Sequence, residues 1–297
     1  MKFGQVLDRL EVIRNLERET HAKVITFYRN ANNGGGIINE QSYTSLVAVL
    51  DQMGDAQPLA IVLDSRGGLT ASGSMIATRL RKHMGSLTVI VPEEAYSAAT
   101  VIALAADKIL CGTHANFTPV ESQYKYKGNW VSILDMEKSR DGVLKAATGR
   151  VLRQTEENLK YLMGRSIRED DKVRQLIKRL LLQDGFHASH SALIPPDELK
   201  GLGAVIEAGV PRSAMALHNL YRQHDFSGDD PSTIIEYSPA NWVTDEDIAQ
   251  SDKIVAYYVD GVCPDCGETR LITDNEYGGP YRRCSNCFWD EVQNPKT

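Results

Sequence analysis

Apolar and polar residues follow one another along the chain in patterns that predict alternating helices and strands. Between residues 5 and 19, apolar residues recur at helical spacing with charged residues between them, which predicts an amphipathic helix. Its apolar stripe is expected to pack on its own domain, with a neighbouring subunit as the alternative. Lys23 to Tyr28 is rich in β-branched and aromatic residues, and Leu59 to Leu63 is apolar throughout. Both segments predict strands, the second of them buried on both faces.

The same two patterns continue through the middle of the chain. They predict helices over residues 41–53, 70–83, 98–106, 142–163, 169–182 and 195–202, and strands over residues 87–91, 108–111 and 204–207. Strands that alternate with helices at this spacing indicate parallel pairing through crossover helices. The expected fold class is therefore α/β.

Two long segments lack a regular pattern. Residues 113–141 are predicted to be irregular, either as a flap that faces the substrate or as a surface excursion. Residues 211–260 are polar, contain a turn cluster from Ser227 to Pro231, and are predicted to be a connector with some local helix.

The composition is that of an ordinary globular protein. The chain has 297 residues, of which 42% are hydrophobic and 24% charged, so a sizeable core is expected. A formal net charge of -6 argues against nucleic acid as the main partner. The first twenty residues are charged throughout and do not form the apolar core of a signal peptide, and no apolar stretch is long enough to span a bilayer. We therefore expect a cytoplasmic protein without a membrane partner.

Four of the five cysteines form two Cys-x-x-Cys pairs near the end of the chain, with 17 residues between the pairs. The four are Cys263, Cys266, Cys284 and Cys287. Four thiolates in this spacing close a tetrahedral site, which predicts a structural Zn²⁺ in a zinc ribbon. The alternative is a pair of redox dithiols, which needs a thioredoxin-like context that the sequence lacks. The ribbon is a candidate surface for a protein partner.

A serine stands where a predicted strand turns into a predicted helix. Ser97 follows the strand at 87–91, while Gly67 and Gly68 follow the strand at 59–63, so both groups lie at the carboxyl ends of parallel strands. There Ser97 is a candidate nucleophile, and the amides of Gly68 and Ala98 are candidate oxyanion donors. These residues alone leave a second interpretation open, in which the glycines form a tight turn and Ser97 caps the helix.

Three segments around this corner resemble a known family. They are Leu63-Asp-Ser-Arg-Gly-Gly-Leu69, Val91-Pro-Glu-Glu-Ala-Tyr-Ser-Ala-Ala-Thr100 and Ile102-Ala-Leu-Ala-Ala-Asp-Lys-Ile109. In order and spacing they are similar to the serine dehydrogenase proteinase family, which is grouped with signal peptide peptidase A in the wider Clp-protease/crotonase fold. The resemblance extends from Lys23 to Val210 and includes Thr118-Pro-Val-Glu-Ser-Gln123.

This resemblance implies a spiral of strand-strand-helix units and a serine peptidase whose nucleophile is Ser97. It also implies a homo-oligomer that acts on peptides or unfolded proteins. The chain departs from the family pattern at Ala99 and Arg66, where the family has glycine and proline. The methyl group of Ala99 crowds the corner, and Arg66 brings a charge near the expected substrate strand.

The general base is the least defined part of the implied site. The Clp-protease branch has a histidine downstream of its serine, but here that region reads Glu121-Ser-Gln123, so its triad is not expected. The peptidase-A branch uses a lysine as its base. In this chain the corresponding position falls near Arg150, whose guanidinium stays protonated and cannot act as a base. Lys145, at the edge of the apolar stripe of its helix, is the preferred base because partial desolvation lowers the pKa of an amine. Lys138 is the second candidate, and a solvated surface charge is the alternative for both lysines.

Two histidines, His187 and His190, flank the loop that precedes the last predicted strand. They are candidate bases or substrate contacts, but a structural role is the simpler interpretation, and neither is placed in the predicted site. Cys111 follows a buried strand and is predicted to be a core residue.

The expected organisation is an amphipathic helix (1–22), a Clp/crotonase-like serine peptidase domain (23–210), a connector (211–260) and a zinc ribbon (261–297). The predicted function is a serine endopeptidase with a Ser97–Lys145 dyad. One alternative is a catalytically silent scaffold that recruits a partner through the ribbon. Another is crotonase-type chemistry on a coenzyme A thioester, for which no acidic base is obviously placed.

Overall fold

A computed structural model describes most of the chain, in two compact units. The described residues are 3–32, 36–126, 128–163, 167, 170–187, 189–223, 226, 230–238, 256–258, 271–274 and 281–284. One unit comprises residues 1–62, 84–86 and 211–297, and the other comprises residues 63–83 and 87–210. No helix among the described residues is long and apolar enough to cross a membrane.

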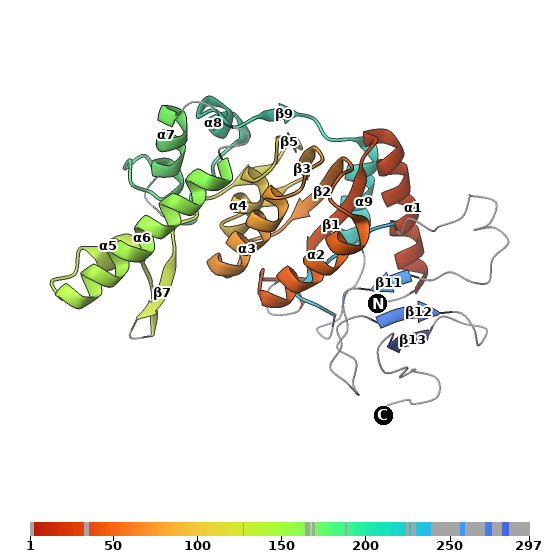
Figure 1. The fold of residues 1–297 in the computed structure, drawn as a ribbon, viewed down its shortest axis with the longest axis horizontal. Coiled ribbons are helices and arrows are strands. Elements are labelled where there is room, and N and C mark those ends of the chain that lie inside the picture. Colours follow the sequence, from red (N-terminus) through yellow and green to blue (C-terminus); the bar gives the residue numbers. More distant parts are fainter. Residues whose placement is uncertain are drawn as a thin grey trace. The chain divides into compact units, whose positions relative to one another are not determined.

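The first unit is built on three neighbouring strands. Its elements are α1 (Phe3–Thr20), β1 (Lys23–Arg29), α2 (Glu40–Met53), β2 (Leu59–Asp64), α9 (Arg212–Gln223) and β10 (Thr233–Ile234) (Figure 1). The strand order is β10-β1-β2, and β10 runs antiparallel to β1. The inner face of α1 buries Leu10, Ile13 and Leu16, which confirms the predicted amphipathic helix, and α1 packs on α9.

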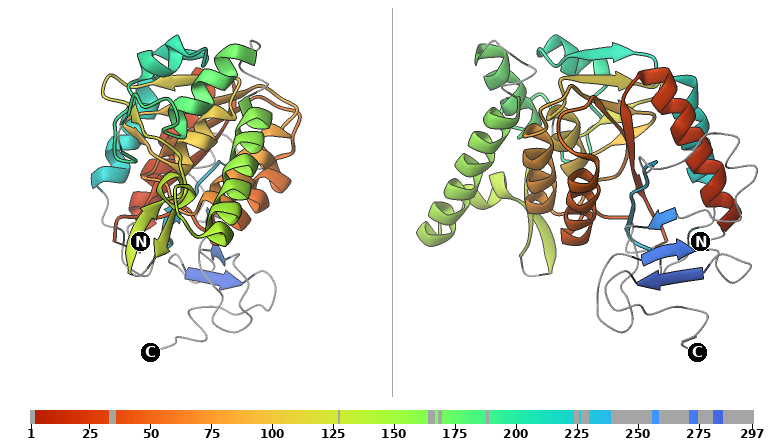
Figure 2. Two further views of the ribbon diagram at one scale, coloured as in Figure 1. Left: turned by 90° about the vertical axis from the view of Figure 1, so that its left-hand side faces the viewer. Right: turned by 45° about the vertical axis from the view of Figure 1, so that its right-hand side comes forward.

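Three short strands near the end of the chain also belong to the first unit. They are β11 (Ala256–Tyr258), β12 (Leu271–Asp274) and β13 (Tyr281–Cys284), which pair antiparallel and lie side by side (Figure 2). Cys263, Cys266 and Cys287 lie outside the described residues, and of Cys284 only the backbone is described. The zinc ribbon therefore stays a prediction.

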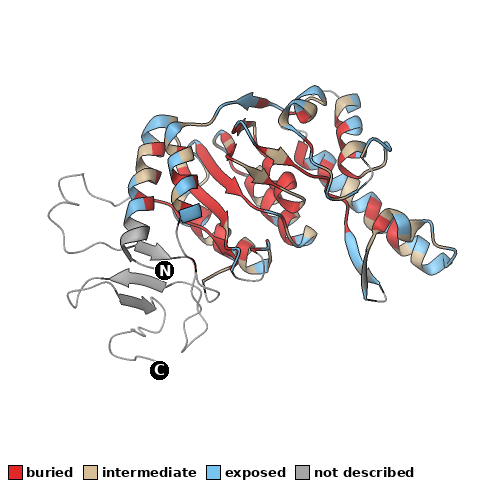
Figure 3. Ribbon diagram, turned by 180° about the vertical axis from the view of Figure 1, so that it is seen from behind, coloured by how far each residue is buried: buried red, intermediate tan, exposed pale blue. Residues whose placement is uncertain are grey.

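The second unit contains the parallel strands that the sequence predicts. Its elements are α3 (Thr70–Arg81), β3 (Leu87–Val91), β4 (Glu94–Ala95), α4 (Ala98–Leu104), β5 (Lys108–Cys111), β6 (Asn116–Phe117), β7 (Gln123–Tyr126), β8 (Asn129–Ser132), α5 (Ile133–Glu137), α6 (Gly142–Met163), α7 (Asp170–Leu180), α8 (Pro196–Gly201) and β9 (Ile206–Ala208). Strands β3, β5 and β9 are parallel neighbours. Almost all residues of β3 are buried (Figure 3), as expected for a strand with both faces covered.

The segment at residues 113–141 is more regular than the sequence predicts. It contains β6, the antiparallel hairpin β7–β8 and the short helix α5, so the prediction of an irregular segment is wrong for these residues. Tyr126 pairs with Asn129 across a two-residue loop whose Gly128 has φ 87. The two-residue period of such a short, mostly exposed hairpin is a weak signal because neither face shows a run of apolar residues.

The segment after residue 211 is also more ordered than predicted. The predicted local helix is confirmed as the 12-residue helix α9, which buries Leu217 and Tyr221. The predicted domain boundaries at residues 22, 210 and 260 stay predictions.

A buried ion pair ties distant parts of the first unit together. Arg9 is 0% exposed, and its Nε and Nη2 atoms donate to the Glu236 carboxylate at 2.7 and 2.6 Å. The Tyr221 hydroxyl donates to the same carboxylate at 2.6 Å. The pKa of Tyr221 is raised, mainly by burial and secondly by the charge of Glu236. The pair thereby fixes α1 to α9 and to the chain that follows β10.

Removing the charge of Glu236 should destabilise the fold because it takes away the carboxylate charge that faces the buried Arg9 guanidinium. We expect Glu236→Gln to lower the free energy of unfolding by about 3–5 kcal/mol in urea denaturation. Glu207→Gln is the matched control, since Glu207 pairs with Lys108 at 3.5 Å with 58% of its side chain exposed. The control should change the free energy by less than about 0.5 kcal/mol. Equal effects of the two substitutions would contradict the prediction.

Candidate active site

Ser97 has a strained backbone at the corner between β4 and α4. Its φ is 51 and its ψ is -116, a conformation that residues with a Cβ rarely adopt. Strain of this kind costs about 1–3 kcal/mol and is concentrated at functional sites, including serine nucleophiles on strand-to-helix turns. The Ser97 side chain makes no capping hydrogen bond, so the helix-cap interpretation of this residue does not hold.

Two buried threonines hold the corner in place. The Ser97 N–H donates to Oγ1 of Thr118 at 2.8 Å. The Thr100 hydroxyl donates to the carbonyl of Ala95 at 2.7 Å, and the Thr118 N–H donates to that hydroxyl at 3.3 Å. Thr100 is 0% exposed and Thr118 is 5% exposed. Neither threonine can be recognised from the sequence, because a hydroxyl that supports a neighbour's backbone carries no spacing signal.

The glycine pair and the serine corner lie together, as the sequence predicts. A Cβ placed on Gly67 would come within 2.5 Å of the Tyr96 carbonyl oxygen and 2.8 Å of the Ser97 Cβ. Gly67 also has φ 88, so both space and conformation require glycine. Ala98 is the first residue of α4, and its N–H therefore has no acceptor within the helix.

The predicted lysine base lies on α6 without a described contact to Ser97. Lys145 is exposed, as is Arg150. Lys138 is 77% exposed and pairs with Asp135 at 3.2 Å. Helix α6 does pack on α3 and α4. In the described chain, Lys145 thus lies on an exposed part of α6.

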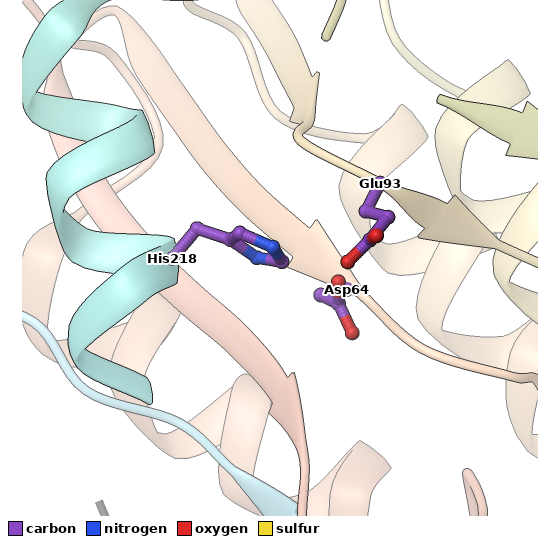
Figure 4. A group of neighbouring side chains, drawn as sticks. All are labelled: Asp64, Glu93 and His218. Atoms are coloured by element: carbon purple, nitrogen blue, oxygen red, sulfur yellow. The ribbon is translucent and has the colours of Figure 1, made fainter. Parts of the chain in front are cut away.

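Burial and nearby charged groups shift the pKa of Tyr96, the residue before Ser97. Burial raises the pKa of Tyr96, and the Glu94, Glu93 and Asp64 carboxylates raise it further while Arg66 opposes them. Carboxylate oxygens of Asp64, at the end of β2, and Glu93 lie within 4.8 Å of each other (Figure 4). Figure 4 also draws His218, a residue of α9 in the first unit. The phenol of Tyr96 is therefore expected to stay protonated at neutral pH.

Arg66, the charge expected near the substrate strand, pairs with Glu94. Its Nε and Nη2 atoms lie 3.0 and 3.4 Å from the two carboxylate oxygens. The hydrogen bond to Glu94 is the main cause of a raised pKa of the guanidinium. With 60% of the Arg66 side chain exposed, the pair leaves this group at the surface beside the corner.

The two loop histidines both contact carboxylates of the second unit. Nε2 of His187 lies 2.9 Å from Oε1 of Glu198. Nδ1 of His190 is hydrogen-bonded to Oε2 of Glu121, which is 2% exposed. The sequence alone places neither histidine in the predicted site. No local sequence pattern shows the contact of Glu121 with a histidine 69 positions along the chain.

An α/β chain with a serine at a strained strand-to-helix corner is the arrangement expected of a serine hydrolase. Residues 1–250 match the family described as ClpP-like SDH-type serine proteinase. The chain belongs to this family, which confirms the family resemblance and, at that level, the serine peptidase class.

Two curated relatives and two solved structures are also similar. Uncharacterized proteins MJ0137 and MJ1495 of Methanocaldococcus jannaschii are 27% and 28% identical over 73% and 74% of this chain, and over 79% and 78% of their own lengths. ClpP1 from Listeria monocytogenes is 16% identical, with 65% of this chain and 96% of that chain covered and a TM-score of 0.41. The 1510-N membrane-bound stomatin-specific protease is 16% identical, with 65% and 84% covered and a TM-score of 0.44.

The close approach of Gly67 to Ser97 predicts that a side chain at position 67 destabilises the fold. Gly67→Ala forces either the Tyr96 carbonyl or the Ser97 side chain to move, so the free energy of unfolding should fall. Gly54→Ala is the matched control, because Gly54 also has a positive φ, 79, but nothing within 4 Å of an added Cβ. In urea denaturation Gly67→Ala should cost at least about 1 kcal/mol more than the control. A cost no larger than that of the control would contradict the close approach.

Proposed function

We propose that this chain is a serine endopeptidase in which Ser97 is the nucleophile. Its Oγ attacks the carbonyl carbon of a peptide bond, a base takes the hydroxyl proton and passes it to the leaving amine, and water then hydrolyses the acyl-enzyme. The observation that carries the proposal is the strained backbone of Ser97, which is held by Thr118 although no glycine occupies the position. Membership in a serine proteinase family supports the same reaction.

The oxyanion hole of the proposed enzyme consists of the amides of Gly68 and Ala98. The close approach of Gly67 to Ser97 supports this assignment, since it brings the two backbone segments into contact. One such donor typically contributes a factor of about 10²–10³ to the rate.

The sequence favours Lys145 as the base. Lys145 is exposed in the described chain, so cover for this amine would have to come from a bound substrate or from a second copy of the chain. The imidazole of His190, which is hydrogen-bonded to Glu121, is another candidate for this role. We further propose a cytoplasmic homo-oligomer that acts on peptides or unfolded proteins, as the family resemblance implies.

Labelling by a fluorophosphonate tests the nucleophile. The wild-type chain should be labelled and should cleave an unfolded protein, whereas Ser97→Ala should lose both activities while keeping its melting temperature. Ser122→Ala, which changes a serine of the same unit, is the matched control and should still be labelled. No labelling of the wild-type chain would overturn the proposal and leave the silent scaffold as the better description. Labelling that persists in Ser97→Ala would assign another nucleophile.

We also propose that the four C-terminal cysteines hold one structural Zn²⁺ and that this ribbon recruits a protein partner. The support is the donor set itself, since two Cys-x-x-Cys pairs supply the four thiolates of a closed tetrahedral site. Cys111 is not part of such a set. It is buried, and burial raises the pKa of its thiol to about 12, which disfavours the thiolate needed for metal binding.

Metal analysis after exhaustive dialysis tests the zinc site. The wild-type chain should retain one zinc ion, and a variant with both Cys284→Ser and Cys287→Ser should lose it because two thiolates cannot close the site. Cys111→Ser serves as the control and should keep the metal. Zinc retention by the double variant would contradict the proposed ligands.

A further inference from the structure

An exposed guanidinium lies beside the serine corner, and the proposed mechanism gives it no role. Arg66 belongs to the short loop between β2 and α3, and 60% of its side chain is exposed. It is followed at once by Gly67, which closely approaches Ser97, and by Gly68, the proposed oxyanion donor. The guanidinium is therefore part of the same short segment that holds the carbonyl of the scissile bond in the proposed reaction.

The backbone on both sides of Arg66 is fixed. The Ser65 N–H donates to the carbonyl of Glu94 at 2.9 Å, and the Tyr96 N–H donates to the carbonyl of Ser65 at 2.9 Å. Oγ of Ser65, a residue that is 1% exposed, accepts the Gly67 N–H at 3.2 Å. Arg66 thus stands between two residues that are tied to the chain leading into the nucleophile corner, so the fold sets its position relative to that corner.

One carboxylate orients the guanidinium without using all of its donors. Nε and Nη2 of Arg66 donate to the two carboxylate oxygens of Glu94, at 3.0 and 3.4 Å. No described residue accepts a hydrogen bond from Nη1 of Arg66. Because a guanidinium has five N–H donors in a fixed plane, the Nη1 side of this group remains for an acceptor that comes from outside.

The carboxylates near Arg66 are less accessible than the guanidinium itself. The Glu94 side chain is 15% exposed, and Asp64 is 1% exposed. Glu93 is half-buried. A substrate side chain can therefore reach the positive group, whereas two of the three negative groups are largely covered.

We propose that Arg66 makes this enzyme prefer substrates with an acidic side chain within two residues of the scissile bond. The substrate carboxylate accepts a charge-assisted hydrogen bond from Nη1, while Glu94 keeps the guanidinium in place. The span fits, since Arg66 and Gly68 are two residues apart, which is at most about 7 Å along an extended chain. This inference rests on the proposed peptidase function and deepens it by naming a class of substrate. The family pattern has proline at position 66, so the preference is a property of this chain.

The test measures kcat/KM for matched peptides that carry Glu, Gln or Lys at one of the two positions on either side of the scissile bond. For the wild-type chain, Glu should be favoured over Gln about three- to tenfold at one of these positions, and Lys should be disfavoured. Arg66→Gln should bring the ratio of Glu to Gln close to one, and Arg66→Glu should make Lys the favoured residue. Because the measured quantity is a ratio, a general loss of activity cannot imitate this result.

Arg174→Gln is the matched control. Arg174 is an arginine of the same unit with a similar side-chain exposure of 65%, and it pairs with Asp171 at 3.5 Å. This variant should keep the wild-type ratio. The preference of the wild-type chain should also weaken when the ionic strength rises from about 0.05 to 0.5 M, since salt screens exposed charges.

Binding of the same peptides to Ser97→Ala tests the contact without turnover. In fluorescence anisotropy the Glu peptide should bind more tightly than the Gln peptide, and adding Arg66→Gln to this variant should remove the difference. Equal binding of the two peptides by Ser97→Ala would contradict the contact even if the wild-type chain cleaved neither of them.

The outcomes distinguish this inference from the function on which it rests. Equal cleavage of the Glu and Gln peptides by the wild-type chain, or a ratio that Arg66→Gln leaves unchanged, would overturn the role of Arg66 and leave the peptidase intact. A preference of the wild-type chain for Lys would also overturn it, because the carboxylates would then set the local charge. Absence of both cleavage and fluorophosphonate labelling in the wild-type chain would overturn the peptidase itself.

Discussion

The backbone of Ser97 is the constraint on which the rest of the proposed site depends. A residue with a Cβ is held at φ 51 only because its surroundings leave it no relaxed alternative. The amide is fixed by Thr118, Thr100 fixes the chain on either side, and Gly67 closes the remaining space. Together these contacts hold a half-buried serine at the start of helix α4.

Much of this arrangement can be predicted from the sequence. The buried strands and the long helices have strong periods, so their places along the chain are confirmed to within a few residues. The partnership of Gly67 with Ser97 is predictable too, because parallel strands bring their carboxyl ends to one edge. The hairpin β7–β8 and helix α9 were underestimated, since short exposed strands and polar helices have weak apolar patterns.

The supporting side chains of the site escape sequence analysis for a different reason. Thr118 holds the nucleophile corner through a hydrogen bond to Ser97, a residue 21 positions away. Such contacts depend on tertiary register, which no local pattern encodes. The predicted base shows the same limit. Helical spacing gives the face of the helix on which Lys145 lies, but it does not tell which part of the protein covers that face. Its exposure became visible only in the folded chain.

The Arg9–Glu236 pair has a consequence for the order in which the chain acquires its structure. The first unit is discontinuous in sequence, since residues 1–62 need the segment after residue 211 to complete their packing. The second unit is almost continuous, from residue 63 to residue 210. During synthesis from the N-terminus, all residues of the second unit leave the ribosome before Glu236 does, and domains generally fold as units. The first unit therefore stays incomplete until Glu236 has been synthesised and can pair with Arg9. The nucleophile corner, which belongs to the second unit, can fold before that pair forms.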